Sequence, residues 1–443
     1  ETFGCQMNDD DSERMLSFLK DDNFTLCSTP NEADLILLNT CSVREKAEHK
    51  VYSMLGRFRS LKEENPELII GVTGCVAQQA GERLIERAPY LDMVIGTHNI
   101  HNLVKLLGKK EKGKKLRIVA TELKEDITRE EYRVSMPLAS KVKATVSIMR
   151  GCDNYCTYCI VPYVRGPEMS RAAEDIIAEV KELTKSGVTE VTLLGQNVNS
   201  YKGGVGFTEL LKLVCGVGEL KRVRFVTSHP KDLSRELIEL FNTEPKLCRQ
   251  IHLPLQSGSN SVLQAMKRGY TVESYMEKVH ALRSLYPSIS LTTDIIVGFP
   301  GESEEDFRMT MDAIEDVGYD NIFSFVYSQR PGTVAAELEE SLSDSEKKER
   351  LYELQKLQKE ITASKQSALV GKIVEVLVEG ESKASKQELS GRTECNKVVN
   401  FSLDDTGTFD KDNIVGSIIQ LKITDAFTNS LRGELVWKEA NVC

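Results

Sequence analysis

The sequence predicts a multidomain α/β protein made of three parts. In residues 1–107, and again in 138–368, apolar runs typical of buried strands alternate with helical periodicity, which indicates parallel sheets covered by helices. From 369 to 438 the chain changes to short β-rich runs with closely spaced turn residues, the pattern of a small antiparallel barrel. A lysine- and glycine-rich stretch predicts a solvated linker over 108–137.

The first part predicts a small flavodoxin- or Rossmann-like layer around a parallel sheet. Two apolar runs, 33–40 and 67–74, each end in a polar turn that contains a cysteine, and helical spacing fills the segment between them. In such sheets ligands collect outside the carboxyl ends of the strands. Cys41 and Cys75 follow these two runs, and Cys5 follows a short segment at the start of the chain. The three thiols therefore either converge on one sheet edge or are buried independently.

The second part alternates six times between strand and helix. Glycine-rich polar turns follow the strands, so we expect a full or partial (β/α)6 barrel with its active site at the carboxyl ends of the strands. The predicted strands begin near residues 143, 188, 222, 250, 290 and 321, and the predicted helices occupy 172–186, 207–217, 233–242, 271–285, 303–317 and 342–368.

The stretch "RGCDNYCTYCIVPYVRG", after the first of these strands, places Cys152, Cys156 and Cys159 within eight positions. A structural zinc site or a ferredoxin-type cluster takes four protein ligands, and no fourth cysteine lies nearby. A 4Fe-4S cluster held by three cysteines keeps one iron open for a non-protein ligand. The spacing therefore indicates a site that binds a molecule as well as a metal cluster.

The composition of the 443 residues argues against several classes of protein. No apolar run is long enough to span a bilayer, so we expect no membrane association. Eleven cysteines in tight clusters favour metal chemistry in a reducing cytoplasm over a secreted disulfide framework. Lys and Arg total 57 against 67 Asp and Glu, a net charge of −10, so any nucleic-acid site must be local.

The three-cysteine spacing, with Tyr158 before the last cysteine, resembles the radical S-adenosylmethionine (SAM) enzymes. Together with "GCQMN", "NTCSVREKAE" and "TGCVAQ", it resembles the radical SAM methylthiotransferases over essentially the whole chain. This resemblance implies a second 4Fe-4S cluster on Cys5, Cys41 and Cys75, a radical SAM core, and a C-terminal TRAM domain that binds RNA.

The resemblance also implies a reaction that uses two SAM molecules per turnover. One methylates a sulfur held at the N-terminal cluster, and the other is cleaved with an electron from an external donor to give a 5′-deoxyadenosyl radical. The strings "LLNTCSVREKAE", "LGQNVNSY" and "GRTECNKVVNF" resemble the branch that methylthiolates carbon 2 of N6-isopentenyladenosine at position 37 of tRNA.

Two alternatives stay open. The first is a methylthiotransferase that acts on threonylcarbamoyladenosine in tRNA or on an aspartate of a ribosomal protein. The second is an iron-sulfur electron-transfer or scaffold protein with an RNA-binding tail. A carrier has no use for an open iron, so two sites of three cysteines favour the enzyme.

Further site residues follow from the positions of the family's turns. The strand-end turns suggest the SAM contacts Tyr158, Gly195, Gln196, Gln256, Ser257, Ile296 and Gly298, although the glycines suit any tight turn. His229 is interpreted as a structural residue. On the small barrel, the cations proposed to contact a tRNA anticodon stem-loop are Lys383, Lys386, Arg392 and Lys397, although they also suit an ordinary solvated face. No obligate protein partner is predicted.

Overall fold

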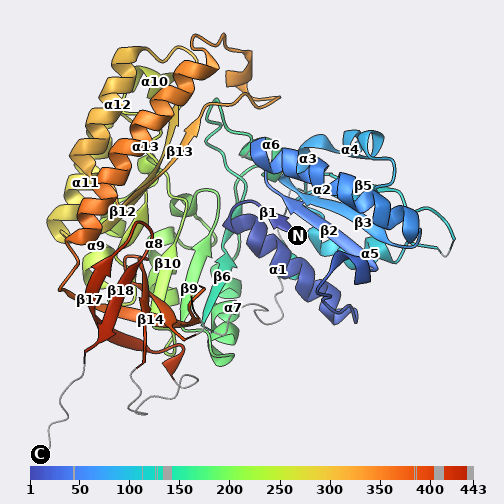
Figure 1. Ribbon diagram of the computed structural model, residues 1–443, viewed down its shortest axis with the longest axis horizontal. Helices are drawn as coiled ribbons and strands as arrows, with labels where there is room; N and C mark the ends of the chain where they lie inside the picture. Colours follow the sequence, from blue (N-terminus) through green and yellow to red (C-terminus); the bar gives the residue numbers. More distant parts are fainter. Residues whose placement is uncertain are drawn as a thin grey trace, which may run out of the picture.

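The computed structural model describes residues 1–42, 45–111, 113–124, 126, 128–132, 142–383, 385, 387–403 and 414–436. The chain forms an N-terminal α/β layer, a central core and a small closed β-barrel, and the N-terminal layer stands beside the first strand of the core (Figure 1). In these ranges, none of the helices combines the length and the apolar character that a membrane crossing needs.

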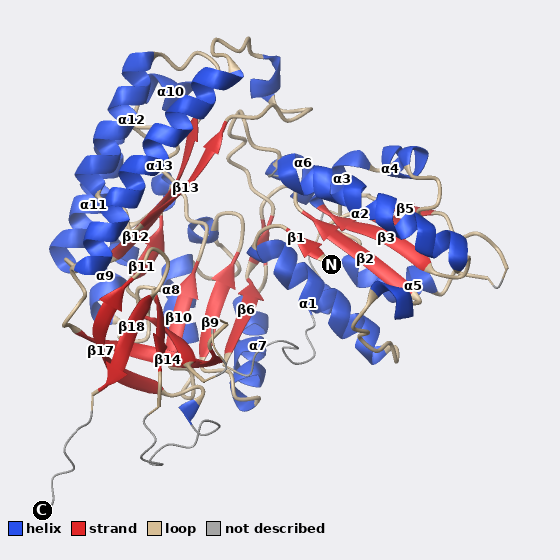
Figure 2. Cartoon of the chain, in the orientation of Figure 1, coloured by secondary structure: helices blue, strands red, loops and turns tan. Residues whose placement is uncertain are grey.

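A parallel sheet with helices on both faces forms the N-terminal layer (Figure 2). Its strands follow chain order: β1 (Thr2–Phe3), β2 (Leu35–Thr40), β3 (Ile69–Gly74), β4 (Met93–Ile95) and β5 (Ile118–Ala120). Its helices are α1 (Gln6–Asp21), α2 (Glu45–Glu64), α3 (Cys75–Ala80), α4 (Glu82–Arg87) and α5 (Leu103–Leu107). Side chains alternate along each strand, so Ile36 and Leu38 pack with α2 while Leu35 and Leu37 pack with α1. The expected α/β layer is confirmed.

β5 lies inside the stretch expected to be a solvated linker. Ile118 pairs in parallel register with Met93, because the apolar run "IVA" can extend the sheet by one edge strand. The lysine-rich residues before it form a surface excursion, in which Lys110 lies 3.4 Å from the Glu67 carboxylate. The predicted linker therefore contains a strand of the N-terminal sheet, and its residues 133–137 lie outside the described ranges.

The central core is a partial barrel of parallel strands in chain order: β6 (Lys143–Ser147), β9 (Glu190–Leu194), β10 (Arg222–Phe225), β11 (Gln250–His252), β12 (Ser290–Val297) and β13 (Asn321–Val326). A parallel bridge between Val223 and Leu247 joins its two hydrogen-bonded halves. A short antiparallel pair, β7 (Met149–Arg150) and β8 (Met169–Ser170), flanks the end of β6.

Helices cover the outer face of this sheet (Figure 2): α7 (Ala173–Lys185), α8 (Phe207–Cys215), α9 (Arg235–Thr243), α11 (Val272–Leu285), α12 (Glu304–Val317) and α13 (Asp344–Ser367). Two short helices complete the core: α6 (Val161–Arg165), which lies where the core meets the N-terminal layer, and α10 (Asn260–Ala265). The six predicted helices are present, with ends within two residues of the predicted bounds. Short 3-10 turns connect elements, among them η3 (Arg129–Tyr132).

Polar caps set where the last core helices begin. Ser303 Oγ accepts a hydrogen bond from the Asp306 amide at 3.1 Å, and the Asp306 carboxylate accepts one from the Ser303 amide at 2.9 Å. Just before this cap, the Glu302 carboxylate accepts from the Gly298 amide at 2.9 Å and from Arg350 on α13 at 2.6 Å. These bonds fix the turn that follows β12.

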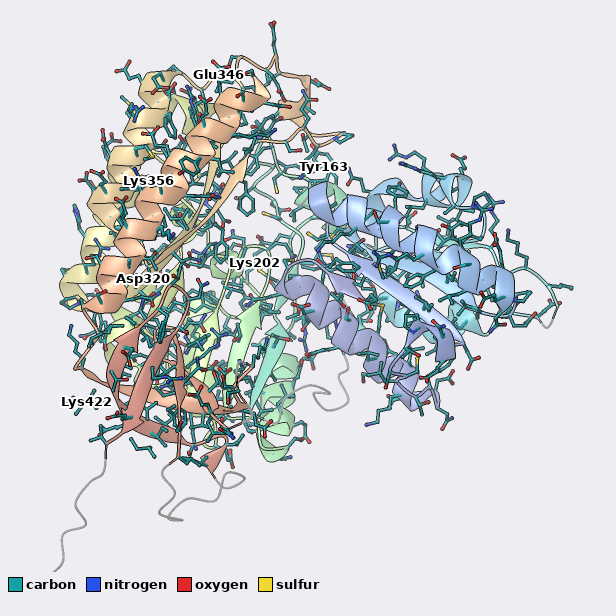
Figure 3. All side chains as sticks on the ribbon, viewed as in Figure 1. Tyr163, Lys202, Asp320, Glu346, Lys356 and Lys422 are labelled. Atoms are coloured by element: carbon teal, nitrogen blue, oxygen red, sulfur yellow. The ribbon has the colours of Figure 1, made fainter. Side chains whose placement is uncertain are left out.

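The C-terminal module is a closed barrel of β14 (Ile373–Glu381), β15 (Leu389–Thr393), β16 (Val398–Phe401), β18 (Leu431–Leu435) and β17 (Ile418–Ala426). Four of its strand pairs are antiparallel, as expected, and β16 and β18 are parallel. Arg222, the first residue of β10, donates to the Arg392 carbonyl at 2.7 Å. Asp320, which precedes β13, pairs with Lys397 at 3.0 Å (Figure 3). The barrel therefore docks at the amino ends of the core strands.

Candidate functional site

Cys5, Cys41 and Cys75, here called the N-terminal cysteines, lie together at the carboxyl edge of the N-terminal sheet. They follow β1, β2 and β3, three neighbouring parallel strands whose ends meet at one edge. The side chain of Cys41 is hydrogen-bonded to both of the others. Cys41 and Cys75 are buried and Cys5 is exposed. Of the two arrangements open from the sequence, the structure has the convergent one.

Two of the N-terminal cysteines ionise more readily than a free cysteine. The hydrogen bond with Cys41, assisted by the nearby Arg165 guanidinium, holds the pKa of Cys5 at about 6, although desolvation by the neighbouring protein atoms opposes this shift. The same causes hold the pKa of Cys75 at about 7. The same hydrogen bonds, together with burial, raise the pKa of Cys41 well above its usual range. The thiolate is the form that binds metal, so Cys5 and Cys75 ionise readily, whereas Cys41 ionises when a metal takes the place of its proton.

Two asparagines, which the sequence patterns did not single out, support this edge. Asn8 Nδ2 donates to Asn39 Oδ1 at 3.1 Å, and Asn39 Nδ2 donates to the Asn8 carbonyl at 2.7 Å. Gly74 has a φ of 87°, and a Cβ there would lie 2.3 Å from Asn39 Oδ1. The amides stand three residues after Cys5 and two before Cys41, which is the signal that could have identified them.

Cys152, Cys156 and Cys159, here called the loop cysteines, lie between β7 and α6 at the carboxyl end of β6. The Cys159 amide donates to the Cys156 carbonyl at 2.9 Å, and the Cys152 amide donates to the Gly166 carbonyl at 3.2 Å. Gly151 has a φ of 74°, and a Cβ there would lie 1.9 Å from a backbone oxygen across the loop. The loop is therefore compact, and its first turn requires glycine.

Both sets of cysteines fit a 4Fe-4S cluster. Burial raises the pKa of Cys152, and it raises that of Cys159 to about 12, so these thiols ionise when a metal takes the place of the proton. Among the described residues, no three Cys, His, Asp or Glu side chains are arranged to bind one metal ion. A cubane cluster does not need that geometry, because each cysteine bonds a different iron. Three thiols in each set would leave one iron open.

Helix α6 connects the two sets of cysteines. Cys75 packs against Ile160 and Val164, which directly follow the loop cysteines. On the same side, the His98 Nε2 atom is hydrogen-bonded to the Arg165 carbonyl at 2.9 Å. Figure 3 shows α6, marked by Tyr163, where the core meets the N-terminal layer. Cys75 and the segment that follows the loop cysteines thus meet at one interface between the N-terminal layer and the core.

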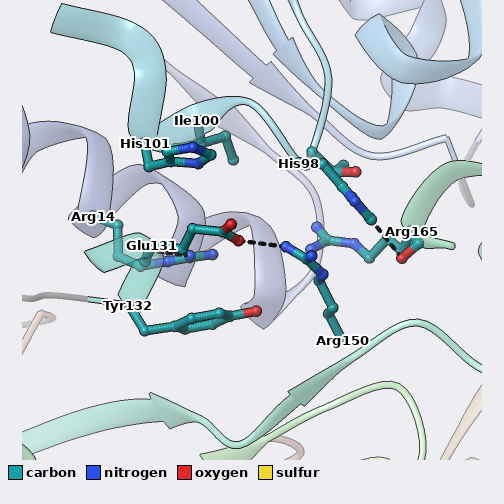
Figure 4. Close-up of a pocket in the computed structure, with 9 residues that line it drawn as sticks. Arg14, His98, Ile100, His101, Glu131, Tyr132, Arg150 and Arg165 are labelled. Carbon is teal, nitrogen blue, oxygen red and sulfur yellow. Dashed lines mark hydrogen bonds and ion pairs between the residues drawn. The ribbon is translucent and has the colours of Figure 1, made fainter. Parts of the chain in front are cut away.

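A buried ionic cluster, formed by Arg14, Glu131 and Arg150, stabilises this interface (Figure 4). The Glu131 carboxylate pairs with Arg150 at 2.5 Å, and Arg14 donates to the Glu131 carbonyl at 3.0 Å. The guanidinium carbons of Arg14 and Arg171 each lie 4.6 Å from the centroid of the Tyr132 ring. Arg14 belongs to α1 and Arg150 directly precedes the glycine turn of the loop, so the cluster links the N-terminal layer to the loop cysteines.

Three family models match the chain. Residues 1–96 match "Uncharacterized protein family UPF0004", residues 146–314 match the radical SAM superfamily, and residues 367–436 match the TRAM domain. The tRNA-2-methylthio-N(6)-dimethylallyladenosine synthase of Syntrophus aciditrophicus is 48% identical over 99% of this chain and 94% of its own length. That of Pelobacter propionicus is 50% identical over 98% of each chain.

The chain belongs to this synthase family. Among solved structures, the radical SAM methyltransferase TsrM from Kitasatospora setae has a TM-score of 0.53 at 14% identity, covering 74% of this chain and 70% of its own. The cobalamin-dependent SAM radical enzyme OxsB has a TM-score of 0.51 at 16% identity, covering 71% of this chain and 49% of its own. At these identities the likeness is one of fold. As a radical SAM enzyme, a member of this family uses a 4Fe-4S cluster and SAM.

Among the predicted SAM contacts, Gln196 has the strongest structural support. Both its amide nitrogen and its amide oxygen are buried without a hydrogen-bond partner in the described chain. Such groups cost free energy unless a partner outside the chain satisfies them. Gln256 has a φ of 71°, a strained conformation for a residue with a side chain, and its amide donates to the Asp294 carbonyl at 2.9 Å.

The other predicted SAM contacts have structural explanations as well. A Cβ at Gly195 would lie 2.5 Å from Met149 Cγ, and one at Gly298 would lie 2.5 Å from Lys347 Cγ. The Ser257 hydroxyl lies 3.3 Å from the Thr310 hydroxyl. Tyr158 and Ile296 pack against one apolar cluster, with Val262, Met266, Phe299, Tyr327 and Ala335. Contact of these residues with SAM stays a prediction.

The predicted RNA-binding cations differ in their freedom to bind phosphate. Lys383 is exposed, whereas Lys386 lies outside the described residues. Arg392 pairs with Glu379 at 3.3 Å, and the Lys397 ammonium is held by Asp320. The last two charges are therefore engaged within the protein.

Proposed function

We propose that this protein methylthiolates carbon 2 of N6-isopentenyladenosine at position 37 of tRNA. The N-terminal cysteines hold one 4Fe-4S cluster, the loop cysteines hold a second, and each turnover uses two SAM molecules. The observation that carries this proposal is the packing of Cys75 against the helix that follows the loop cysteines, because it connects one set of cysteines to the segment that carries the other. Relatives of this name that match nearly the whole chain support the choice of substrate.

The protein's own residues position and shield the reaction. When bound, the cofactors supply methyl transfer to sulfur and a radical that removes hydrogen from the adenine carbon. Ile160 and Val164 keep water away from Cys75 on one side of the interface. The buried amide of Gln196 offers both a donor and an acceptor to a polar ligand at the ends of the core strands. The apolar contacts limit side reactions of a radical with solvent.

The proposed partner is the anticodon stem-loop of tRNA, in the cytoplasm, with an external electron donor. The TRAM match supports RNA binding by the small barrel. Since that barrel docks at the amino ends of the core strands and the cysteines lie at the carboxyl ends, an RNA that contacts both must extend along the core. The target base must leave the loop stack, which costs least for an unpaired base.

The substrate is tested by incubating anaerobically reconstituted protein with SAM, a reductant and either isopentenylated or threonylcarbamoylated tRNA. We expect mass spectrometry of the digested nucleosides to find the methylthio group on the isopentenylated adenosine. Methylthiolation of threonylcarbamoyladenosine alone would assign the protein to the branch of methylthiotransferases that acts on that nucleoside. Failure of the reduced protein to cleave SAM would favour an iron-sulfur carrier. Iron analysis should give about eight irons per chain, and about four would remove the second cluster.

Single cysteine variants separate the two proposed clusters. Cys156→Ala should abolish 5′-deoxyadenosine formation, because the loop cysteines then lack a ligand for the electron-transferring cluster. Cys41→Ala should still form 5′-deoxyadenosine but yield no methylthiolated tRNA. Cys215→Ala, a buried cysteine outside both sets, is the control and should keep both activities. Normal methylthiolation by Cys41→Ala would contradict the two-cluster assignment.

A further inference from the structure

Within the described ranges, the buried cation Arg268 forms no ion pair with an Asp or Glu side chain. The residue is only 5% exposed, and the side chains that most affect its charge are Tyr158, Tyr270 and Cys156. The buried arginines near the two sets of cysteines differ in this respect, since Arg150 pairs with Glu131 and Arg165 pairs with Asp11 at 2.7 Å. An uncompensated buried charge is strongly unfavourable, so Arg268 requires an anion that a bare chain does not supply.

The hydrogen bonds of Arg268 hold its guanidinium against Cys156, one of the loop cysteines. Nη1 donates to Cys156 Sγ at 3.2 Å, Nη2 donates to the Pro254 carbonyl at 3.2 Å, and Nε donates to the Tyr270 hydroxyl at 3.1 Å. The Tyr270 hydroxyl in turn donates to the Leu255 carbonyl at 2.7 Å. The carbonyl and the hydroxyl are neutral acceptors. Among these partners, the sulfur of Cys156 is therefore the one that becomes anionic when it binds iron.

We propose that Arg268 is the fixed counter-charge of the cluster on the loop cysteines and that it favours the one-electron reduction of this cluster. A donor to a ligand sulfur withdraws negative charge from the iron, and a nearby cation stabilises the more negative, reduced state. The electron comes from the external low-potential donor. Arg268 is thus a positioning residue that acts through Cys156. This inference rests on the proposed function, because it takes the loop cysteines as cluster ligands.

The test is an anaerobic redox titration, followed by electron paramagnetic resonance, of the full-length protein carrying Cys41→Ala so that one cluster is observed. In the absence of SAM, adding Arg268→Gln should lower the equilibrium constant for reduction about tenfold, a shift of about 59 mV to more negative potential. Arg268→Lys keeps the charge and should restore part of the shift. Arg235→Gln, which removes an exposed arginine, is the control and should not change the potential.

Two results would overturn this role, and a third would contradict the proposed function instead. An unchanged potential in Arg268→Gln without SAM, with a difference only after SAM is added, would assign the guanidinium to the SAM carboxylate and refute the proposal. If Arg268→Gln does not retain iron, two other variants take its place: Arg268→Lys, and Tyr270→Phe, which removes a hydrogen bond that orients the guanidinium. Both must show a shift to more negative potential. Unchanged potentials in both variants refute the proposal. Absence of any cluster in the Cys41→Ala protein would instead contradict the proposed function.

Discussion

Removal of the Glu131 charge should loosen the junction between the N-terminal layer and the loop cysteines. Glu131 and Arg150 have side chains that are only 3% and 6% exposed, and their atoms are 2.5 Å apart. Removing one partner of such a pair leaves the other charge buried and costs about 3–5 kcal/mol. At about 1.4 kcal/mol per factor of ten, local opening at η3 should become about 10²- to 4 × 10³-fold more frequent in Glu131→Gln.

Hydrogen–deuterium exchange of the intact protein measures this opening directly. The peptides to follow are those that contain η3 and the middle of α1, because Arg14 joins the two. The matched control is Glu239→Gln, which removes a carboxylate paired with Arg235 at 2.9 Å where the two side chains are 53% and 88% exposed. Such a pair contributes at most about 1 kcal/mol. Equal protection of η3 in Glu131→Gln and the unmodified protein would refute the reasoning.

Three further predictions concern the loop, a buried histidine and the RNA surface. Gly151→Ala should lose about four irons per chain, since its Cβ would clash across the loop, and full iron content would contradict this account. Burial, with a contribution from neighbouring cations, lowers the pKa of His229 to about 2. Below pH 6.5 the unfolded chain then binds a proton that the folded one does not, so the free energy of unfolding should fall by about 2 kcal/mol between pH 6.5 and 5.0. In His229→Gln, acid denaturation curves should lack this component, and an unchanged pH dependence would exclude it. Lys383→Ala should weaken tRNA binding and lower its salt dependence by about one ion. Lys397→Ala should leave that salt dependence unchanged, because Asp320 already neutralises the ammonium, and equal effects would contradict this difference.

The fold followed from local patterns because each element carries its own signal. Strand-length apolar runs, helical spacing and polar caps such as Ser303 and Asp306 occur within a few residues of one another, so the core helices were located almost to their ends. β5 was missed because a strand of three residues carries too little periodicity to stand out in a lysine-rich stretch. The parallel pairing of β16 with β18 depends on barrel closure, which strand-length patterns do not encode.

The sequence by itself determined which side chains could hold clusters, because the spacing of the loop cysteines is a local property and the strand ends of a parallel sheet place the N-terminal cysteines on one edge. Only the tertiary structure decided how the two sets relate. The packing of Cys75 against Ile160, the bond from Arg14 to Glu131 and the bond from Arg268 to Cys156 join residues that are 85 to 117 positions apart. These groups interact because folding buries them next to one another. Whether a charge is buried depends on the tertiary surroundings, which no local sequence pattern encodes.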